Sequence, residues 1–428
     1  MLIEFSVSNF LSFREKQTFS MVASPRLRKK ENVFKPVVNG EKLPDLLKVA
    51  AIYGPNASGK SNLIKALGIV QQIASLQPRA QSKPLPVSPF RFDPLLADQP
   101  SRIEMHFIYA GQRYTFELAA TQERIVEEQL LAFPMGKETL LYERRHSVTG
   151  DEYKFGAHLE GGAELHEAWR KLTGPQVLFI AQAAANSSEE LMQLREPFQW
   201  MQQGITVVSE DMQPWAAETQ KLAKKIPGFT EDISSFLQEV DVPITAIRFD
   251  PISQSTLLSR AKNALSDLNN DATGTLQSIA AMPKNKTALT HRTALGEAQF
   301  DFQEESEGTK SLIGFWLPWW LIGNALHKLR RTLVVDELDS SLHPKIVATL
   351  VEKHIKLDSP AQLIFTTHDT HLMDTKLLRR DQFWLTERDA NGATQLRSIH
   401  DFEGRESEDL EKRYYEGRYR GLPFVRKG

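Results

Sequence analysis

Gly54-Pro-Asn-Ala-Ser-Gly-Lys-Ser61 follows the apolar run Val49-Ala-Ala-Ile-Tyr53 and precedes a helical pattern that continues to about Ser75. A strand, a glycine-rich loop and a helix in this order are typical of a phosphate-binding loop. Gly54 and Gly59 let backbone N–H groups turn inward at a helix N-terminus, where they bind anions. We therefore predict a nucleotide site, in preference to a glycine-rich turn without a ligand.

Each position of this loop has an expected role toward ATP and Mg²⁺. Lys60 supplies a positive charge to the β- and γ-phosphates and is also expected to act in catalysis, and the Ser61 hydroxyl can bind Mg²⁺. The residues predicted to contact the nucleotide are Gly54, Pro55, Asn56, Ala57, Ser58, Gly59, Lys60, Ser61 and Asn62.

The composition is that of an ordinary globular protein with room for two or three domains: 428 residues, 41% hydrophobic, net charge −2. The near-neutral charge argues against a general nucleic-acid coat. The absence of cysteine excludes disulfides, a cysteine zinc site and a thiol nucleophile. The N-terminus lacks a signal-peptide core, and the apolar stretch 312–322 is too short to span a bilayer. We expect a cytoplasmic protein with no membrane partner.

The N-terminal part, residues 1–157, is predicted to hold the phosphate-binding loop and an antiparallel β-layer. Alternating apolar and polar residues predict two paired strands near the N-terminus and four more after a proline-rich connection. These runs are 2–9, 16–22, 102–109, 113–118, 124–132 and 139–144.

Residues 158–295 change character and are predicted to form a mainly helical insertion that serves interactions. Apolar periodicity near 3.6 residues predicts helices, and an alternating run and a polar stretch predict a strand and a loop. The helices are expected at 160–172, 188–203, 215–225, 230–240 and 253–268, the strand at 243–250 and the loop at 267–286.

Residues 296–428 alternate strand-like and helical patterns, which predicts a parallel sheet with covering helices and hence an α/β fold. A strand at 298–302 leads to a helix at 309–329. The runs 332–335 and 362–365 are continuously apolar, as expected for strands buried on both faces. A further helix is expected to begin near Pro344.

Polar residues follow both buried strands. Asp336 is expected to hold Mg²⁺ beside Ser61, and Glu337 to accept a proton from the attacking water. His368 follows the neighbouring strand, where an imidazole can sense the γ-phosphate. The alternatives are a capped strand end and a histidine hydrogen-bonded within a loop. His343 and His371 are expected to have packing or capping roles.

The stretch Ser306-Glu-Gly-Thr309 precedes the next helix. Its hydroxyl groups, Gly308 and the helix N-terminus together make a second phosphate-binding surface. Because the chain already has one phosphate loop, this surface most economically serves a nucleotide on another subunit. The alternative is an ordinary helix cap.

The order of these motifs resembles that of ABC-class ATPases. More specifically, it is similar to the SMC-like, RecF- and OLD-related AAA-type proteins of bacterial anti-phage defence. The resemblance covers roughly residues 1–75 and 296–420. It looks most like the RloA/AriA-type branch in Phe5-Ser-Val-Ser-Asn-Phe-Leu-Ser-Phe13, Asp336-Glu-Leu-Asp-Ser-Ser-Leu-His-Pro344, Thr366-Thr-His-Asp369 and Tyr415-Glu-Gly-Arg-Tyr419.

This resemblance implies an ABC-type P-loop ATPase head with a mixed sheet, in which two subunits sandwich ATP. Ser306, Gly308 and Thr309 would then contact the nucleotide of the other subunit. Asp339 would couple the two sites, and His368 would be the switch histidine. The family also uses a glutamine toward Mg²⁺, for which Gln182 is our candidate, with Gln176 and others as alternatives.

Only 60 residues follow His368, too few for the C-terminal TOPRIM nuclease of OLD proteins, so we expect the effector to be a separate chain. The leading hypothesis is an oligomeric ATPase that controls such an effector, a TOPRIM-type nuclease, in response to a phage protein. One alternative is a RecF-like ATPase that binds DNA through residues 26–30. The other is a scaffold that binds ATP without hydrolysing it.

Overall fold

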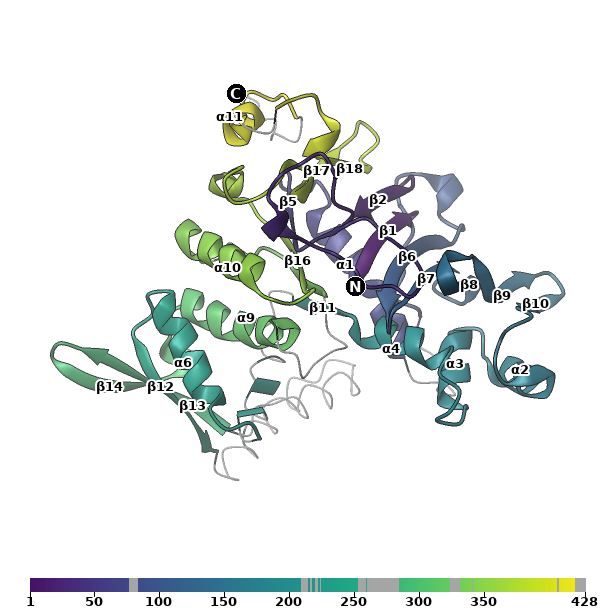
Figure 1. The fold of residues 1–428 in the computed structure, drawn as a ribbon, viewed down its shortest axis with the longest axis horizontal. Coiled ribbons are helices and arrows are strands. Elements are labelled where there is room, and N and C mark those ends of the chain that lie inside the picture. Colours follow the sequence, from purple (N-terminus) through teal and green to yellow (C-terminus); the bar gives the residue numbers. More distant parts are fainter. Residues whose placement is uncertain are drawn as a thin grey trace. The chain divides into compact units, whose positions relative to one another are not determined.

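The described part of the chain forms two compact units (Figure 1). The computed structural model describes residues 1–76, 84–208, 225–252, 285–323, 332–340, 342–405 and 408–419, with isolated positions between 215 and 259. The first unit comprises Met1–Val207, Ile322–Leu338 and Leu350–Gly428, and the second comprises Val208–Leu321 and Asp339–Thr349. The three parts predicted from the sequence, 1–157, 158–295 and 296–428, remain a proposal about which segment does what.

A six-stranded mixed sheet forms the centre of the first unit, which confirms the α/β fold. Its strand order is β11-β15-β16-β5-β17-β18. Strands β15, β16, β5 and β17 run parallel, and β18 is antiparallel to β17. The bounds are β5 Val49–Tyr53, β11 Ile205–Val208, β15 Thr332–Val335, β16 Gln362–Thr366, β17 Phe383–Arg388 and β18 Thr394–Ser398.

The three apolar runs predicted as buried strands are β5, β15 and β16, and every residue in them is buried. β16 lies between the other two, so the strand before the phosphate loop and the strand before Asp336 are separated by one strand. Neighbouring strands lie about 4.8 Å apart. This spacing leaves room for a ligand between the carboxyl ends of β5 and β15.

A second, seven-stranded antiparallel sheet has the order β10-β9-β8-β7-β6-β1-β2. The predicted antiparallel layer is confirmed. The two N-terminal strands belong to this same sheet. Strand β10 also belongs to it, although the sequence did not indicate this strand. The bounds are β1 Leu2–Ser8, β2 Gln17–Ser20, β6 Ser101–Tyr109, β7 Gln112–Ala120, β8 Ile125–Ala132, β9 Thr139–Ser147 and β10 Gly150–Phe155.

One hydrophobic core joins the two sheets and helix α1 (Lys60–Ala74). Phe5 and Phe107 contribute from the antiparallel sheet, and Ile52 and Ile364 from the central one. The alternation of apolar and polar residues along the antiparallel strands explains this arrangement, because it turns one face of the sheet inward.

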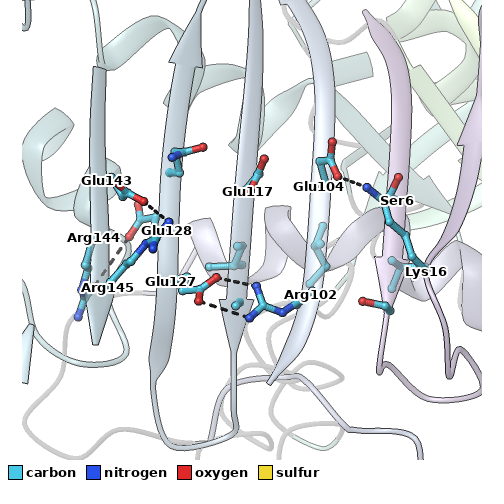
Figure 2. A pocket seen from close by; sticks show the side chains of 16 residues that line it. Ser6, Lys16, Arg102, Glu104, Glu117, Glu127, Glu128, Glu143, Arg144 and Arg145 are labelled. Atoms are coloured by element: carbon cyan, nitrogen blue, oxygen red, sulfur yellow. Dashed lines mark hydrogen bonds and ion pairs between the residues drawn. The ribbon is translucent and has the colours of Figure 1, made fainter. Parts of the chain in front are cut away.

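The opposite face of the antiparallel sheet carries paired charges around a small hollow of about 140 Å³ (Figure 2). Lys16 pairs with Glu104, Arg102 with Glu127 and Arg145 with Glu143, with N–O distances of 2.5–2.6 Å. Exposed ion pairs of this kind contribute only about 0–1 kcal/mol each. The hollow therefore belongs to a solvated sheet surface.

A buried carboxylate holds the start of helix α3 (Phe179–Ala185). Glu128 on β8 is fully buried and accepts hydrogen bonds from the N–H groups of Phe179 (2.8 Å) and Ile180 (3.2 Å). The hydroxyl of Tyr142 donates to the same carboxylate at 2.7 Å. Burial raises the pKa of Glu128.

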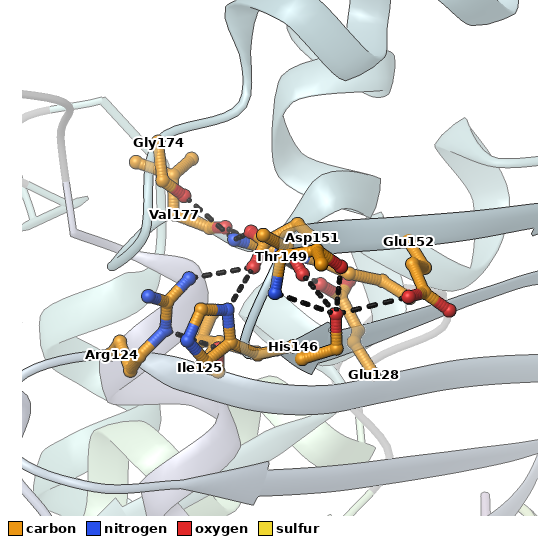
Figure 3. A network of polar contacts seen from close by, with 12 residues as sticks. Arg124, Ile125, Glu128, His146, Thr149, Asp151, Glu152, Gly174 and Val177 are labelled. Carbon is orange, nitrogen blue, oxygen red and sulfur yellow. Dashed lines mark hydrogen bonds and ion pairs between the residues drawn. The ribbon is translucent and has the colours of Figure 1, made fainter.

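Arg144 on β9 extends this network to Asp151, Gly174 and Val177. Figure 3 shows where these three partners lie. Its guanidinium donates to the carbonyls of Val177 (2.8 Å) and Gly174 (3.1 Å) and pairs with Asp151 at 2.6 Å. The strands β8–β10 thus fix the chain from residue 174 to the first turn of α3.

Helices follow in the region predicted to be helical. Helix α4 lies against α1. The predicted helix 188–203 begins only at Arg195, and β11 then joins the central sheet, which the sequence did not indicate. The bounds are α2 Gly162–Leu172, α4 Arg195–Gln203, α6 Phe229–Glu239, α9 Glu307–Gly323, α10 Pro344–Lys356 and α11 Leu410–Tyr415.

The second unit has its own three-stranded antiparallel sheet and an aromatic core. The sheet order is β12-β13-β14, with bounds Ile244–Pro251, Asn285–Thr293 and Gly296–Asp301. Phe229 on α6 contacts Trp316 and Trp320 on α9, with ring centroids 4.9 and 5.3 Å apart. Aromatic contacts of this kind explain why α9 is apolar on nearly every side.

Some predicted elements shift or fall outside the described residues. The loop expected up to residue 286 is wrong at its end, because Asn285 already begins β13. The helix expected from Thr309 begins at Glu307, and its continuation from 324 to 329 lies outside the described residues. Most of the helix expected at 253–268, most of the loop after it, and much of the helix expected at 215–225 also lie outside the described residues. Within the described residues, no helix combines the length and apolarity needed to cross a membrane.

Candidate functional site

The loop between β5 and α1 has the backbone of a phosphate-binding nest. Gly59, the residue before α1, has a φ of 106°, which only glycine adopts without strain. No side chain of the described residues caps α1. The first N–H groups of a 15-residue helix therefore point at whatever lies in the loop, and such a helix end attracts anions.

Lys60 reaches into the middle of the loop. Only 6% of the residue is exposed, and its Nζ donates hydrogen bonds to the carbonyls of Gly54 (2.8 Å) and Pro55 (3.2 Å). A buried ammonium group beside a helix N-terminus is suited to binding several phosphate oxygens at once.

Hydroxyl groups from distant parts of the sequence hold the loop in place. Thr386 Oγ1 on β17 lies 2.5 Å from Ser58 Oγ. Thr394 Oγ1 on β18 hydrogen bonds to the carbonyl of Ser58 (2.8 Å) and to Ser12 Oγ (2.7 Å). Asn62 Nδ2 donates to the same Ser12 oxygen at 2.8 Å. These contacts give the loop one fixed conformation, as a preorganised anion site requires.

A single buried hydroxyl positions both acidic residues after β15. Thr366, at the end of β16, donates to the Asp336 carboxylate and accepts from the backbone N–H of Glu337, both at 2.7 Å. Glu337 has a φ of 53°, which costs a non-glycine residue about 1–3 kcal/mol. This strained turn redirects the chain so that Glu337, but not Asp336, lines the cavity described next.

The predicted residues meet in one open cavity of about 780 Å³. It is lined by phosphate-loop residues, Glu337 and His368, so the structure brings together the predicted phosphate loop, general base and switch histidine. The full lining is Leu11, Ser12, Asn56, Ala57, Gly59, Lys60, Ser61, Asn62, Pro89, Arg91, Phe92, Glu337, His368, Arg388 and Gly392. Of the lining side chains, Lys60, Arg91 and Arg388 are cationic and Glu337 alone is acidic, which favours a polyanionic ligand.

Ser306, Gly308 and Thr309 lie in the second unit, at the start of α9. The Ser306 hydroxyl accepts a hydrogen bond from the Thr309 N–H at 3.1 Å and lies 2.9 Å from the Thr309 hydroxyl. Ser306 is therefore a helix cap, the alternative kept open above. A capping hydroxyl beside a second hydroxyl at a helix N-terminus still fits a phosphate group.

Gln182 lies on α3 and is not among the residues that line the cavity. Its helix begins where Glu128 accepts the N–H groups of Phe179 and Ile180, on the antiparallel sheet. The structure thus does not bring Gln182 to the phosphate loop. The alternative Gln176 hydrogen bonds to the carbonyl of Gln122 and is also absent from the cavity.

The weaker histidine candidates have local partners. His343 accepts a hydrogen bond from the Lys345 N–H at 3.2 Å at the start of α10, which is the capping role expected of it. His371 pairs with Asp369 at 2.9 Å, and this hydrogen bond raises the pKa of His371. Asp339 lies in the second unit, where its carbonyl accepts from Leu342.

Sequence reasoning missed several residues that line the cavity and two that hold the phosphate loop. Arg91, Phe92 and Arg388 carry no motif that identifies them, and Thr386 and Thr394 belong to strands that were not predicted. Ser12 had a signal, since it lies within the stretch 5–13 that carried the resemblance.

The sequence matches the family model described as "AAA domain, putative AbiEii toxin, Type IV TA system" over residues 49–374. The chain belongs to this AAA-domain family. The match spans the phosphate loop, β15 and His368, the same residues that the cavity brings together.

Two solved structures resemble this AAA-domain protein. One is the SMC head domain from Thermotoga maritima, with 15% identity, 93% of this chain and 98% of that chain covered, and a TM-score of 0.38. The other is an SMC head bound to the C-winged helix domain of ScpA, with 13% identity, coverage of 93% and 97%, and a TM-score of 0.40. The fold of this chain rests on the sheets described above. A search of curated proteins gave no match.

Proposed function

We propose that this AAA-domain protein binds ATP with Mg²⁺ and hydrolyses it, and that the nucleotide joins two subunits. The observation that carries this proposal is the cavity in which Lys60, Ser61, Glu337 and His368 meet. Membership in the AAA-domain family supports the nucleotide as ligand.

The residues of the cavity, together with Asp336, which precedes Glu337 but does not line the cavity, have complementary roles in this proposal. Lys60 and the N–H groups at the start of α1 hold the phosphates. Ser61 and Asp336 would hold Mg²⁺, which neutralises charge on the phosphate oxygens. Glu337 accepts a proton from the attacking water, and His368 donates a hydrogen bond to the terminal phosphate. Within the described residues, no group of three or more His, Asp or Glu could hold a metal on its own. The proposed Mg²⁺ site therefore depends on the phosphates.

The start of α9 is proposed to close the site of a second copy. Ser306, Gly308 and Thr309 offer hydroxyl groups and a helix N-terminus, and they lie in a different unit from the phosphate loop. A phosphate surface of this kind is compatible with a homodimer that sandwiches ATP at the interface.

Phosphate release and light scattering, measured on the same samples, test both parts. We expect the wild type to release phosphate, and Glu337→Gln to accumulate an ATP-dependent dimer without release. Lys60→Ala should neither release phosphate nor form the dimer. Ser306→Arg should bind ATP as a monomer. A wild type that dimerises with ATP but never releases phosphate would instead be the non-hydrolysing scaffold.

We also propose that the dimer controls a separate effector, a TOPRIM-type nuclease, in anti-phage defence, with a phage protein as the trigger. The description of the family, which includes a toxin of a toxin–antitoxin system, is consistent with such a role. Purification of the tagged protein from infected cells should recover a nuclease with the wild type. Equal infection outcomes for the wild type and Lys60→Ala would contradict the defence role.

A basic surface favours a second candidate function, DNA binding. Arg26, Arg28 and Lys30 are exposed on one loop, and Lys29 from the same loop donates to the carbonyl of the exposed Lys376. Such a cluster binds phosphates in a salt-dependent manner. Filter binding of DNA at about 50 and about 200 mM salt tests this second function. Retention that Arg26→Glu and Arg28→Glu do not reduce would exclude this surface.

A further inference from the structure

The cavity has an aromatic wall beside the phosphate loop. Phe92 lines it and is 68% exposed, an unusual state for a large aromatic side chain. A phosphate group gains nothing from contact with such a ring. A ligand with an apolar planar part can pack against it, because ligand cavities combine apolar surfaces with a few polar groups.

The residues on either side of Phe92 are anchored to other parts of the chain. Two residues earlier, Phe90 is buried, its ring centroid lies 5.7 Å from that of Phe92, and its N–H donates to Asn9 at 2.9 Å. One residue later, Asp93 accepts two hydrogen bonds from Arg14, at 2.9 and 2.7 Å. The exposed ring between these anchors is therefore held in position rather than left to move with a loop.

Arg388 completes the wall. Its guanidinium lies over the Phe92 ring, 5.5 Å from the centroid, a cation–π distance. Arg388 ends β17, the strand whose Thr386 contacts Ser58 of the phosphate loop. The same strand thus supports the phosphate-binding end of the cavity and this aromatic wall.

We propose that Phe92 stacks on the base of the bound nucleotide and that Arg388 orients the ring. This inference rests on the proposed nucleotide-binding function and assigns the part of the cavity that the motifs leave without a role. An aromatic face responds to the area of a base rather than to its hydrogen-bond pattern. Phe92 should therefore contribute equally to the affinity for ATP and for GTP.

Calorimetric titration with ATP, GTP and inorganic tripolyphosphate tests the proposal, because tripolyphosphate has no base. We expect Phe92→Ala to weaken ATP and GTP binding about tenfold and to leave tripolyphosphate binding unchanged. Phe92→Tyr should restore most of the affinity. Leu95→Ala is the matched control, since Leu95 is 83% exposed in the same segment but does not line the cavity.

The outcomes separate this inference from the function on which it rests. Equal ATP binding by wild type and Phe92→Ala would overturn the stacking role while leaving the ATP site intact. Equal losses for ATP and tripolyphosphate would also overturn it, because they would indicate damage to the phosphate loop. Failure of the wild type to bind either ligand would overturn the nucleotide site itself. Thermal unfolding of each variant verifies that the chain remains folded.

Discussion

Gly59 is the residue on which the phosphate loop depends most directly. A Cβ atom at this position would lie 2.0 Å from Thr394 Oγ1 and 2.9 Å from Ser12 Oγ, the two hydroxyls that hold the loop. We expect Gly59→Ala to lose ATP binding by more than about tenfold, a free-energy change of about 1.4 kcal/mol, because the loop must move away from β18. Titration with ATP measures this loss.

Gly150 provides the matched control for Gly59→Ala. It has a similar positive φ of 124°, but nothing lies within 4 Å of the position of its Cβ. Gly150→Ala should therefore cost about 1–2 kcal/mol of folding stability from backbone strain alone and leave ATP binding unchanged. Similar ATP affinities for the two variants would show that the contacts with Thr394 and Ser12 do not matter.

At the scale of single residues, the sequence predicted several side chains that meet in the cavity, but not the residues that hold the loop in place. Lys60, Ser61, Glu337 and His368 could be placed because each belongs to a short motif next to an apolar run. Thr386 could not, because its role comes only from the pairing of β17 with β5, and pairing between distant strands leaves no local pattern. Gln182, which does not line the cavity, was chosen without such a motif, because a lone glutamine carries no spacing that identifies it.

Among the elements, α11 contacts the segment after His368 through the Thr370 hydroxyl. Thr370 Oγ1 donates to the Glu411 carboxylate at 2.7 Å and lies 3.0 Å from the Tyr415 hydroxyl. Thr370→Val keeps the shape and removes both contacts, a local loss of about 1 kcal/mol. We expect faster hydrogen exchange in Leu410–Tyr415 and no change in α4.

A control for this change is Thr173→Val. The Thr173 hydroxyl donates to the Trp169 carbonyl at 2.7 Å, at the C-terminal end of α2. Exchange in α11 should be the same in this variant as in the wild type. If Thr370→Val also leaves α11 unchanged, the hydrophobic contacts of Leu410 and Tyr414, both buried, are enough to hold the helix.

The elements themselves were predictable wherever one periodicity dominated. The buried strands β15 and β16 and the antiparallel strands β6–β9 were found to within a few residues, because their apolar runs or alternation are uninterrupted. β10 and β11 were missed. The alternation in β10 covers only Glu152–Phe155, and β11 is only four residues long. Patterns this short do not identify a strand, so pairing with neighbouring strands makes each of them one.

For the whole molecule, we expect stability to fall in mild acid because of His354. This residue is fully buried, its Nε2 lies 3.3 Å from the carbonyl of Ala361, and burial lowers its pKa to about 4. The neighbouring Lys48 also disfavours a second positive charge.

The direction of the pH effect follows from proton binding. Between pH 6.5 and about 4 the unfolded chain protonates this histidine and the folded chain does not. The free energy of unfolding therefore falls as pH decreases, by up to about 3 kcal/mol from this group. Urea unfolding of wild type and His354→Gln from pH 7.5 to 4.5 should show the difference between them shrinking with acid. Parallel curves would mean that His354 does not titrate as its burial requires.

The position of β5 in the central sheet also has a consequence for how the chain is made. β5 pairs with β16 on one side and β17 on the other, and about 330 residues separate Tyr53 from Arg388. At about 5–20 residues per second, the apolar strand before the phosphate loop waits roughly 20–70 s for its neighbours to leave the ribosome. During that time its two edges are open to other chains. Synthesis is thus the stage at which this protein is most exposed to aggregation, and expression at low temperature or with a holding chaperone should raise its soluble yield.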